Sequence, residues 1–328
     1  MSVRTRRILV LGMACAVAAV TASCASGSAA RHSTMTLYTC ASANVEQAVV
    51  SAFEKAHSGT KIDVFRAPTG QLNARIAADA RSGGLRPDVI WACDPLTMHG
   101  YDEQGLLAPW APANAAEIPS AYRTPHFVGV DLLYMVLAIH KGLPPPATYA
   151  ALTARGFKDS VALPNPSFAA SALGMLGYFA SAPGYGMTYY QQLKSNGAVQ
   201  VNSPSDALTG VERGTYRAAF TLANAAYLDQ KKGSPIEVVW PKPGGIAIYA
   251  PIGVTTKKDR SPLATQFASY AASRDGQKLM AGQGTYVPID GLGGPPIPAG
   301  SPIVSPEWSA LFAKYKSVLA DYVALFGS

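Results

Sequence analysis

Charge, long apolar runs and cysteine are all scarce in this chain of 328 residues. Charged residues make up only 14% of the sequence, and beyond the N-terminus the basic residues gather no further than the pairs Lys231-Lys232 and Lys257-Lys258. This distribution does not support nucleic acid binding, which depends on concentrated positive charge. After the N-terminal segment, no apolar run reaches the roughly 20 residues that a membrane-spanning helix needs.

Catalytic and metal-binding motifs are also missing. The sequence has no G-x-S-x-G elbow, no C-x-x-C pair and no Walker P-loop. The segment Gly282–Gly284 has two glycines of a dinucleotide fingerprint but follows a predicted helix, so we interpret it as a helix end. The five histidines lack metal-ligand spacing; they are His32, His57, His99, His126 and His140. The sequence predicts no enzyme, no cofactor and no metal site.

The N-terminus has the pattern of an export signal. Three arginines within the first seven residues precede the uncharged apolar run 8–20, which is too short to span a bilayer. Thr21-Ala22-Ser23-Cys24 resembles a bacterial lipobox, in which the cysteine is lipidated. We therefore expect a signal peptide at 1–23, lipidation of Cys24 and a tether at 24–34, which would anchor the protein outside the cytoplasm on the cell membrane. A plain signal peptide cut near Ala30, or an uncleaved anchor, remains an alternative.

Two cysteines remain for the folded part. Cys15 lies in the signal and Cys24 is the lipidation candidate, which leaves Cys40 and Cys93. An even pair in an oxidising compartment suggests a disulfide. Two small buried thiols are the alternative, since free cysteine packs well in protein interiors.

Strand-like and helix-like segments alternate along the chain, which predicts parallel β-sheet with right-handed crossovers. A second series of such segments begins after the apolar segment 129–140 and ends at 246–255. We expect a first lobe at 35–128 and 256–328, completed by a C-terminal helix at 308–326, and a second lobe at 129–255. The first series consists of strands at 35–39, 61–66 and 87–92 with helices at 44–57 and 71–81.

Several polar residues lie where predicted strands lead into helices, the usual place for ligands in α/β sheets. Ser42, Thr69-Gly70 and Ser171 are at helix starts, whose backbone N–H groups and dipole favour an anion. Ordinary helix capping is the alternative for each of them. Asp94 follows a strand, and we favour capping over a bond to ligand. Aromatic residues such as Trp240 either line a cleft or belong to the core.

Seven segments, in order, resemble a family of bacterial extracellular solute-binding proteins of ABC importers, which includes binders of ferric ion, thiamine, polyamines and 2-aminoethylphosphonate. The resemblance covers nearly all of the chain after the signal. It implies a periplasmic-binding-protein type II-like α/β fold, with two lobes, a two-strand hinge and a ligand cleft between them. It also implies a monomer with permease and ATPase subunits as partners. The segments are LYTCASANVEQAVVSAFEKAH, TGQLNARIAADA, PDVIWACDPLTMHGYDEQGLLAPW, the Pro164–Pro166 turn, YYQQLKSNGAVQV, VERGTYRAAFT and ASRDGQKLMAGQGTYVPI.

The cargo is inferred by elimination within this family. Ferric binders carry adjacent tyrosines just after the strand that matches 217–221, whereas this chain has Leu222-Ala223-Asn224-Ala225. Polyamine binders carry several carboxylates, and the matching first-lobe loops have only Asp94. We therefore expect a small polar, anionic solute: a phosphonate, a phosphate ester or a carboxylate. The expected ligand-binding set is Ser42, Thr69, Gly70, Asp94, Ser171, Asn224 and Trp240. A sensor or scaffold lipoprotein of the same fold is the alternative, followed by an exported enzyme or a ferric-ion binder.

Overall fold

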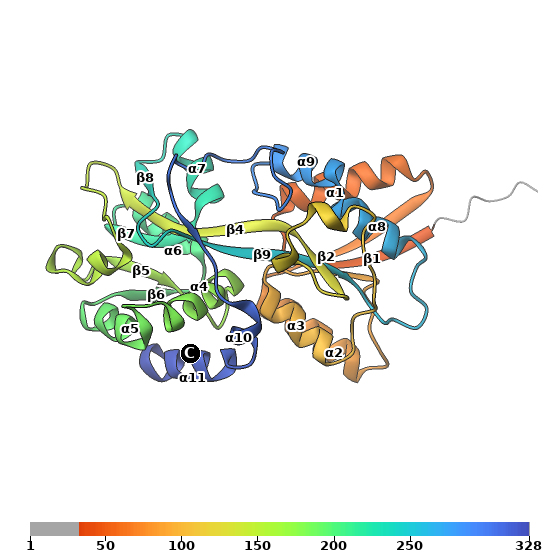
Figure 1. Cartoon of the computed structure of the whole chain (residues 1–328), viewed down its shortest axis with the longest axis horizontal. Coiled ribbons are helices and arrows are strands. Elements are labelled where there is room, and N and C mark those ends of the chain that lie inside the picture. The colour runs from red at the N-terminus through yellow and green to blue at the C-terminus, as the bar shows by residue number, and fades with distance from the viewer. Residues whose placement is uncertain (1–32, 328) are drawn as a thin grey trace, which may run out of the picture. The chain divides into compact units, whose positions relative to one another are not determined.

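The computed structural model describes residues 33–327 (Figure 1). The predicted signal peptide, the lipidation candidate Cys24 and all but the last two residues of the predicted tether lie outside the described residues. In the described part, no helix is both long enough and apolar enough to cross a membrane.

The first lobe begins with alternating strands and helices, as the sequence predicts. Strand β1 pairs in parallel with β2 on one side and β3 on the other. Val45, Val49 and Phe53, which the sequence places on one helical face, are buried on that face of α1. The elements are β1 (Ser33–Thr39), α1 (Ala43–Ala56), β2 (Thr60–Arg66), α2 (Thr69–Arg81), β3 (Val89–Trp91) and α3 (Pro95–Glu103), followed by the 3₁₀ turns Ala115–Glu117 and Ser120–Tyr122.

Two long antiparallel strands, β4 (Phe127–His140) and β9 (Gly245–Val254), connect the lobes (Figure 1). One end of β9 pairs with β3 of the first lobe, and one end of β4 pairs with β7 (Ala218–Leu222) of the second. The strand order is therefore β2-β1-β3-β9-β4-β7-β5-β6, in which β5 is Val161–Pro164 and β6 is Val199–Val201. We call β4 and β9 the hinge strands, and they confirm the two-strand hinge of the expected fold.

The second lobe repeats the alternation around its own parallel strands. Strand β5 pairs in parallel with β6 and β7, and β8 pairs antiparallel to β4. Helices α8 and α9 return to the first lobe and pack on α1. The second-lobe elements are the 3₁₀ turns Tyr149–Thr153 and Arg155–Phe157, then β5 (Val161–Pro164), α4 (Ala170–Ser181), α5 (Gly186–Ser195), β6 (Val199–Val201), α6 (Pro204–Glu212), α7 (Ala223–Lys231) and β8 (Ile236–Val239); after β9 come α8 (Leu263–Ala272), α9 (Arg274–Gly282), β10 (Ile303–Val304), α10 (Trp308–Phe312) and α11 (Tyr315–Phe326).

The C-terminal helix differs from the expectation in two ways. It is divided into α10 and α11 around Lys314, and α11 packs on α4 and α5 of the second lobe rather than on the first (Figure 1). Glycine also lets α10 approach α4 closely: a Cβ on Gly177 of α4 would lie 2.1 Å from Cδ2 of Leu311 in α10. The apolar stripe of a helix shows which face is buried, but not which partner buries it. The lobe boundaries near 128 and 255 stay predictions.

The hinge strands contain a buried carboxyl at an irregularity of the ladder. The register between β4 and β9 shifts between Gly129 and Asp131, and Thr285 donates a hydrogen bond of 2.6 Å from Oγ1 to Asp131 Oδ1. Burial raises the pKa of Asp131 from the ordinary 3.8 to about 7. The hinge therefore contains an acid that takes up its proton near neutral pH.

Replacing Asp131 with Asn should remove a pH dependence of stability. The raised pKa means that the folded protein holds this proton more tightly than the unfolded chain, so the carboxyl's contribution is fully present below about pH 4 and is lost as pH rises through about 7. Relative to the wild type, Asp131→Asn should become more stable by roughly 1–4 kcal/mol between about pH 4 and pH 8. Urea unfolding at several pH values measures this, with the exposed Asp321→Asn as control. Parallel pH curves for Asp131→Asn and the wild type would contradict it.

Candidate functional site

A pocket of about 590 Å³ lies where loops of both lobes meet. Ser42 precedes α1 of the first lobe, and Asn224 lies in the first turn of α7 in the second lobe. Both line this pocket, which we call the helix-start pocket. The structure thus brings together two of the residues that the sequence proposes, from positions 182 apart in the chain. The segment Gly282–Thr285 after α9 and the loop Gly294–Pro296 complete its wall.

The polar groups of the helix-start pocket are partly unused. Neither α1 nor α7 has an N-cap side chain that accepts a hydrogen bond from its first turn. The side-chain oxygen of Asn224 is buried and has no partner among the residues that the structure describes. Of the described lining residues, Lys231 is the one with a charged side chain. The pocket therefore offers free backbone donors, an ammonium and an amide, which together suit a small anion with a donor of its own.

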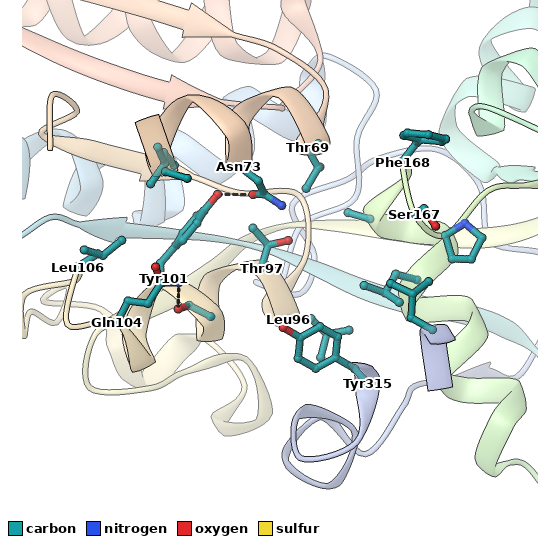
Figure 2. A pocket seen from close by; sticks show the side chains of 18 of the residues that line it. Thr69, Asn73, Leu96, Thr97, Tyr101, Gln104, Leu106, Ser167, Phe168 and Tyr315 are labelled. Atoms are coloured by element: carbon teal, nitrogen blue, oxygen red, sulfur yellow. Dashed lines mark hydrogen bonds between the residues drawn. The ribbon is translucent and has the colours of Figure 1, made fainter. Parts of the chain in front are cut away.

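A second pocket, of about 370 Å³, lies between α2 and α3 on one side and the turn before α4 on the other (Figure 2). Thr69 and Gly70 line it as the first residues of α2, which begins two residues before the predicted helix 71–81. Across from them lies Phe168, which is 52% exposed. Within the described chain, its lining includes no charged side chain. We call it the neutral pocket.

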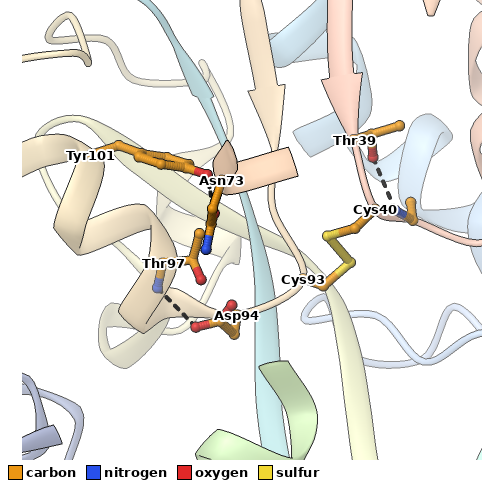
Figure 3. The surroundings of a disulfide bond; sticks show 8 residues. Thr39, Cys40, Asn73, Cys93, Asp94, Thr97 and Tyr101 are labelled. Carbon is orange, nitrogen blue, oxygen red and sulfur yellow. Dashed lines mark hydrogen bonds between the residues drawn. A yellow bond between two sulfur atoms is a disulfide. The ribbon is translucent and has the colours of Figure 1, made fainter. Parts of the chain in front are cut away.

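Asp94 caps α3, which is the interpretation that the sequence favours. Thr97 N donates to Asp94 Oδ1 over 2.8 Å, and Asp94 is 0% exposed (Figure 3). Burial raises the pKa of this carboxyl, while the hydrogen bonds from Thr97 and Leu96 lower it. Asp94 lines neither pocket, so a bond to ligand stays a prediction without geometric support.

Ser171 and Trp240 also lie away from both pockets. Ser171 is buried in the first turn of α4, and the residue at the N-cap is Ala169. Trp240 donates from Nε1 to the hydroxyl of Tyr227 over 3.0 Å, and Tyr227 lines the helix-start pocket. Trp240 thus supports the wall of that pocket rather than facing its interior.

Other lining residues were not expected from the sequence. Lys231 lines the helix-start pocket, although the sequence shows it only as half of a basic pair. Asn73 lines the neutral pocket and accepts a hydrogen bond from the Tyr101 hydroxyl. Asn73 lies four residues beyond the first residue of α2, and nothing in the sequence marks that position as part of a pocket. Lys231 is the last residue of α7, where a basic residue is favoured by the helix dipole whether or not a ligand binds.

The structure joins Cys40 and Cys93 in a disulfide (Figure 3). Cys40 follows β1 and Cys93 follows β3, and their Cα atoms lie 5.8 Å apart. Ser42 is two residues beyond Cys40, and Asp94 directly follows Cys93. The bridge therefore fixes two neighbouring loops of the first lobe against each other, one of which leads into the helix-start pocket.

A metal centre has no basis in the described residues, since no group of three or more His, Cys, Asp or Glu side chains is placed to hold an ion. The Tyr189 and Tyr190 side chains are both buried in the second-lobe core. Tyr189 donates to the Tyr149 carbonyl over 2.8 Å. The adjacent tyrosines are thus used for packing.

Residues 35–285 match the family described as bacterial extracellular solute-binding protein. No curated protein sequence matches the chain. Among solved structures, the periplasmic binding protein AfuA from Actinobacillus pleuropneumoniae, with exogenous fructose-6-phosphate bound, has a TM-score of 0.77 at 17% identity and covers 89% of this chain and 98% of that chain. Iron-bound HitA from Pseudomonas aeruginosa has a TM-score of 0.74 at 20% identity, covering 88% and 99%. The ferric binding protein from Campylobacter jejuni has a TM-score of 0.77 at 15% identity, covering 89% and 99%. Identities this low establish a shared fold.

Removing the disulfide should destabilise the protein without changing its fold. The two cysteines are 53 positions apart, and a loop of this size closed by a disulfide is worth about 2–4 kcal/mol. We expect urea unfolding to give the double variant Cys40→Ser/Cys93→Ser a free energy of unfolding that is about 2–4 kcal/mol lower than that of the wild type. Adding a reductant should lower the free energy of unfolding of the wild type by the same amount and should leave that of the double variant unchanged. A wild type that is insensitive to reduction would contradict the assignment.

Proposed function

The chain belongs to the bacterial extracellular solute-binding protein family, and from this premise we propose that it captures a small polar, anionic solute and delivers it to an ABC importer. The cargo is a phosphonate, a phosphate ester or a carboxylate. Its partners are the permease and ATPase subunits of that importer. The proposed binding site is the helix-start pocket.

The observation that carries this proposal is the set of unused donors in that pocket. Two helix N-termini from different lobes line it, and each contributes about 0.3–1 kcal/mol to binding of an anion. Lys231, at the other end of α7, lines the same pocket and adds a full positive charge to it. The neutral pocket has no charged lining residue within the described chain, so it is the weaker candidate for an anion.

Placement of the donors on both lobes links binding to closure. A solute that contacts Ser42 and Asn224 together interacts with both lobes at once. A ligand shifts a conformational equilibrium by its difference in affinity for the two states. The closed arrangement gains contacts from both lobes and is therefore favoured when the solute is bound.

Similar proteins support a charged cargo without deciding which one. AfuA is described with fructose-6-phosphate, a phosphate ester, and HitA is described with iron. In the segment where the ferric-ion binders of this family carry adjacent tyrosines, this chain has Asn224 and no tyrosine. The described residues also contain no metal-binding cluster. These features favour an anion over iron.

Changing the charge of the helix-start pocket should weaken anion binding. We expect Lys231→Gln to raise the dissociation constant of an anion roughly fivefold, the equivalent of about 1 kcal/mol. Asn224→Ala should have a similar effect on glycerol 3-phosphate, whose hydroxyls can donate to the Asn224 side-chain oxygen. Lys232→Gln is a matched control, because Lys232 is the next residue, pairs with Asp229 at 3.0 Å and does not line the pocket. Titration calorimetry with methylphosphonate, glycerol 3-phosphate and succinate measures this.

Putrescine and glucose serve as cationic and neutral comparison solutes in the same titrations. Tight binding of either one, with none of the three anions bound, would exclude the anionic cargo. Equal weakening by Lys231→Gln and Lys232→Gln would exclude the helix-start pocket as the site.

We also propose that the protein is exported and anchored to the membrane by a lipid on Cys24. Cys24→Ala should move the protein from the membrane fraction to the soluble fraction or the medium. Cys15→Ala is the control, since Cys15 lies within the apolar run of the signal. A Cys24→Ala protein that stays in the membrane fraction would favour the uncleaved anchor instead.

A further inference from the structure

A third cavity, of about 380 Å³, lies against the hinge strands and shares no lining residue with the helix-start pocket or the neutral pocket. Three segments form most of it: the turn Ala121–Thr124 before β4, Tyr249 of β9, and the segment Ser305–Ser309 that begins α10. His99 of α3 completes the wall. We call it the hinge pocket.

Aromatic rings make up the apolar part of the hinge pocket. The ring centroids of Tyr122 and Tyr249 are 5.1 Å apart, and those of Tyr249 and Trp308 are 5.6 Å apart at an interplanar angle of 86°. Tyr249 and Trp308 are both buried. Rings in this arrangement present flat faces and edges to an occupant, which favours a planar ligand.

Two buried donors in the lining have no acceptor. Arg123 Nε and Trp308 Nε1 are buried and unpartnered in the described structure. None of the described ion pairs includes Arg123. A guanidinium presents its N–H groups in a fork that matches the two oxygens of a carboxylate. The missing acceptor is therefore best supplied by a carboxylate.

The other titratable groups of the lining have different roles. Burial lowers the pKa of His99, although Asp102 and Glu103 oppose this, so its imidazole is neutral at neutral pH and adds no charge for an anion. Glu307 is exposed and also lines the cavity. Its carboxylate repels an anionic occupant, so Arg123 must supply the attraction.

The hinge pocket rests directly on the irregular part of the hinge. A Cβ on Gly129, where the register of β4 shifts, would lie 3.1 Å from both Tyr122 Cβ and Tyr249 Cδ2. Two of the lining aromatics therefore lie close to the hinge backbone at its register shift. An occupant that lies against these two rings is next to the hinge.

We propose that the hinge pocket is a second binding site, for a small planar organic acid whose carboxylate pairs with Arg123 and whose flat apolar part lies against Tyr122, Tyr249 and Trp308. This site is separate from the solute site and does not depend on it. Its ligand carries an aromatic or conjugated carboxylate.

Benzoate is the probe, and its neutral analogue benzamide is the matched comparison. Benzoate binding, followed by calorimetry and by tryptophan fluorescence, should be about tenfold weaker in Arg123→Gln. The exposed Arg213→Gln should bind as the wild type does, and Glu307→Gln should bind more tightly. Trp308→Phe keeps an aromatic ring but loses the indole N–H donor, and should bind benzoate several-fold more weakly. On the wild type, benzamide should bind more weakly than benzoate.

Three results would overturn the proposal. They are no benzoate binding at millimolar concentration, equal affinity for benzoate and benzamide on the wild type, and loss of benzoate binding in Lys231→Gln with Arg123→Gln unaffected. The last result places benzoate in the helix-start pocket. The comparison of benzoate with benzamide on the wild type tests the need for a carboxylate, and benzoate binding in Lys231→Gln separates the hinge pocket from the helix-start pocket, so the proposal stays testable even if Arg123→Gln fails to fold.

Discussion

The antiparallel pairing of β4 with β9 is the constraint on which the rest of the structure depends. These strands connect the hydrogen-bonded sheets of the two lobes, because β9 pairs with β3 of the first lobe and β4 pairs with β7 of the second. All ten residues of β9 are buried, and one hydrophobic cluster extends from Ile90 in the first lobe to Phe179 in the second. Relative motion of the lobes must therefore preserve this ladder, whose register is irregular near Gly129.

The two halves of the proposed solute site have different stiffness. On the first lobe, the Cys40–Cys93 bridge fixes the loop that leads to Ser42. On the second lobe, Asn224 follows β7 directly and has no covalent tie of this kind in the described chain. A preorganised half loses little conformational entropy when the solute arrives. The first lobe is thus suited to initial capture, and the second to adjustment during closure.

The sequence predicts local features well, because these depend on neighbours in the chain. The four-residue spacing of Val45, Val49 and Phe53 identifies the buried face of α1. Ser42 and Asn224 follow strands of different lobes, and β1 and β7 run in opposite directions on the two sides of the hinge strands, so that both residues come to one pocket. The cysteine pair follows the adjacent parallel strands β1 and β3, whose carboxyl ends share an edge of the sheet.

What the sequence misses depends on packing between distant segments. Trp240 is an aromatic residue of the kind that often lines a cleft. It instead supports the wall of the helix-start pocket by its hydrogen bond to Tyr227, a contact that no local sequence pattern encodes. Ser171 lies at a helix start but is buried. The apolar residues Leu311, Val318 and Tyr322 of the C-terminal segment are buried as their spacing predicts, while the close approach of α10 to α4 depends on the missing side chain of Gly177.

The C-terminal segment has a consequence for the kind of motion that is possible. From α9 in the first lobe, the chain crosses to α10, which contacts α3, and continues to α11 on the second lobe (Figure 1). The lobes are thus joined by three covalent crossings: β4, β9 and this outer segment. Two adjacent strands alone form a narrow ribbon that resists torsion weakly. The third crossing runs along this ribbon, since Leu132 N of β4 donates to the Tyr286 carbonyl and β10 pairs with β9. It therefore widens the joint, and a wider joint resists torsion more strongly than two strands alone.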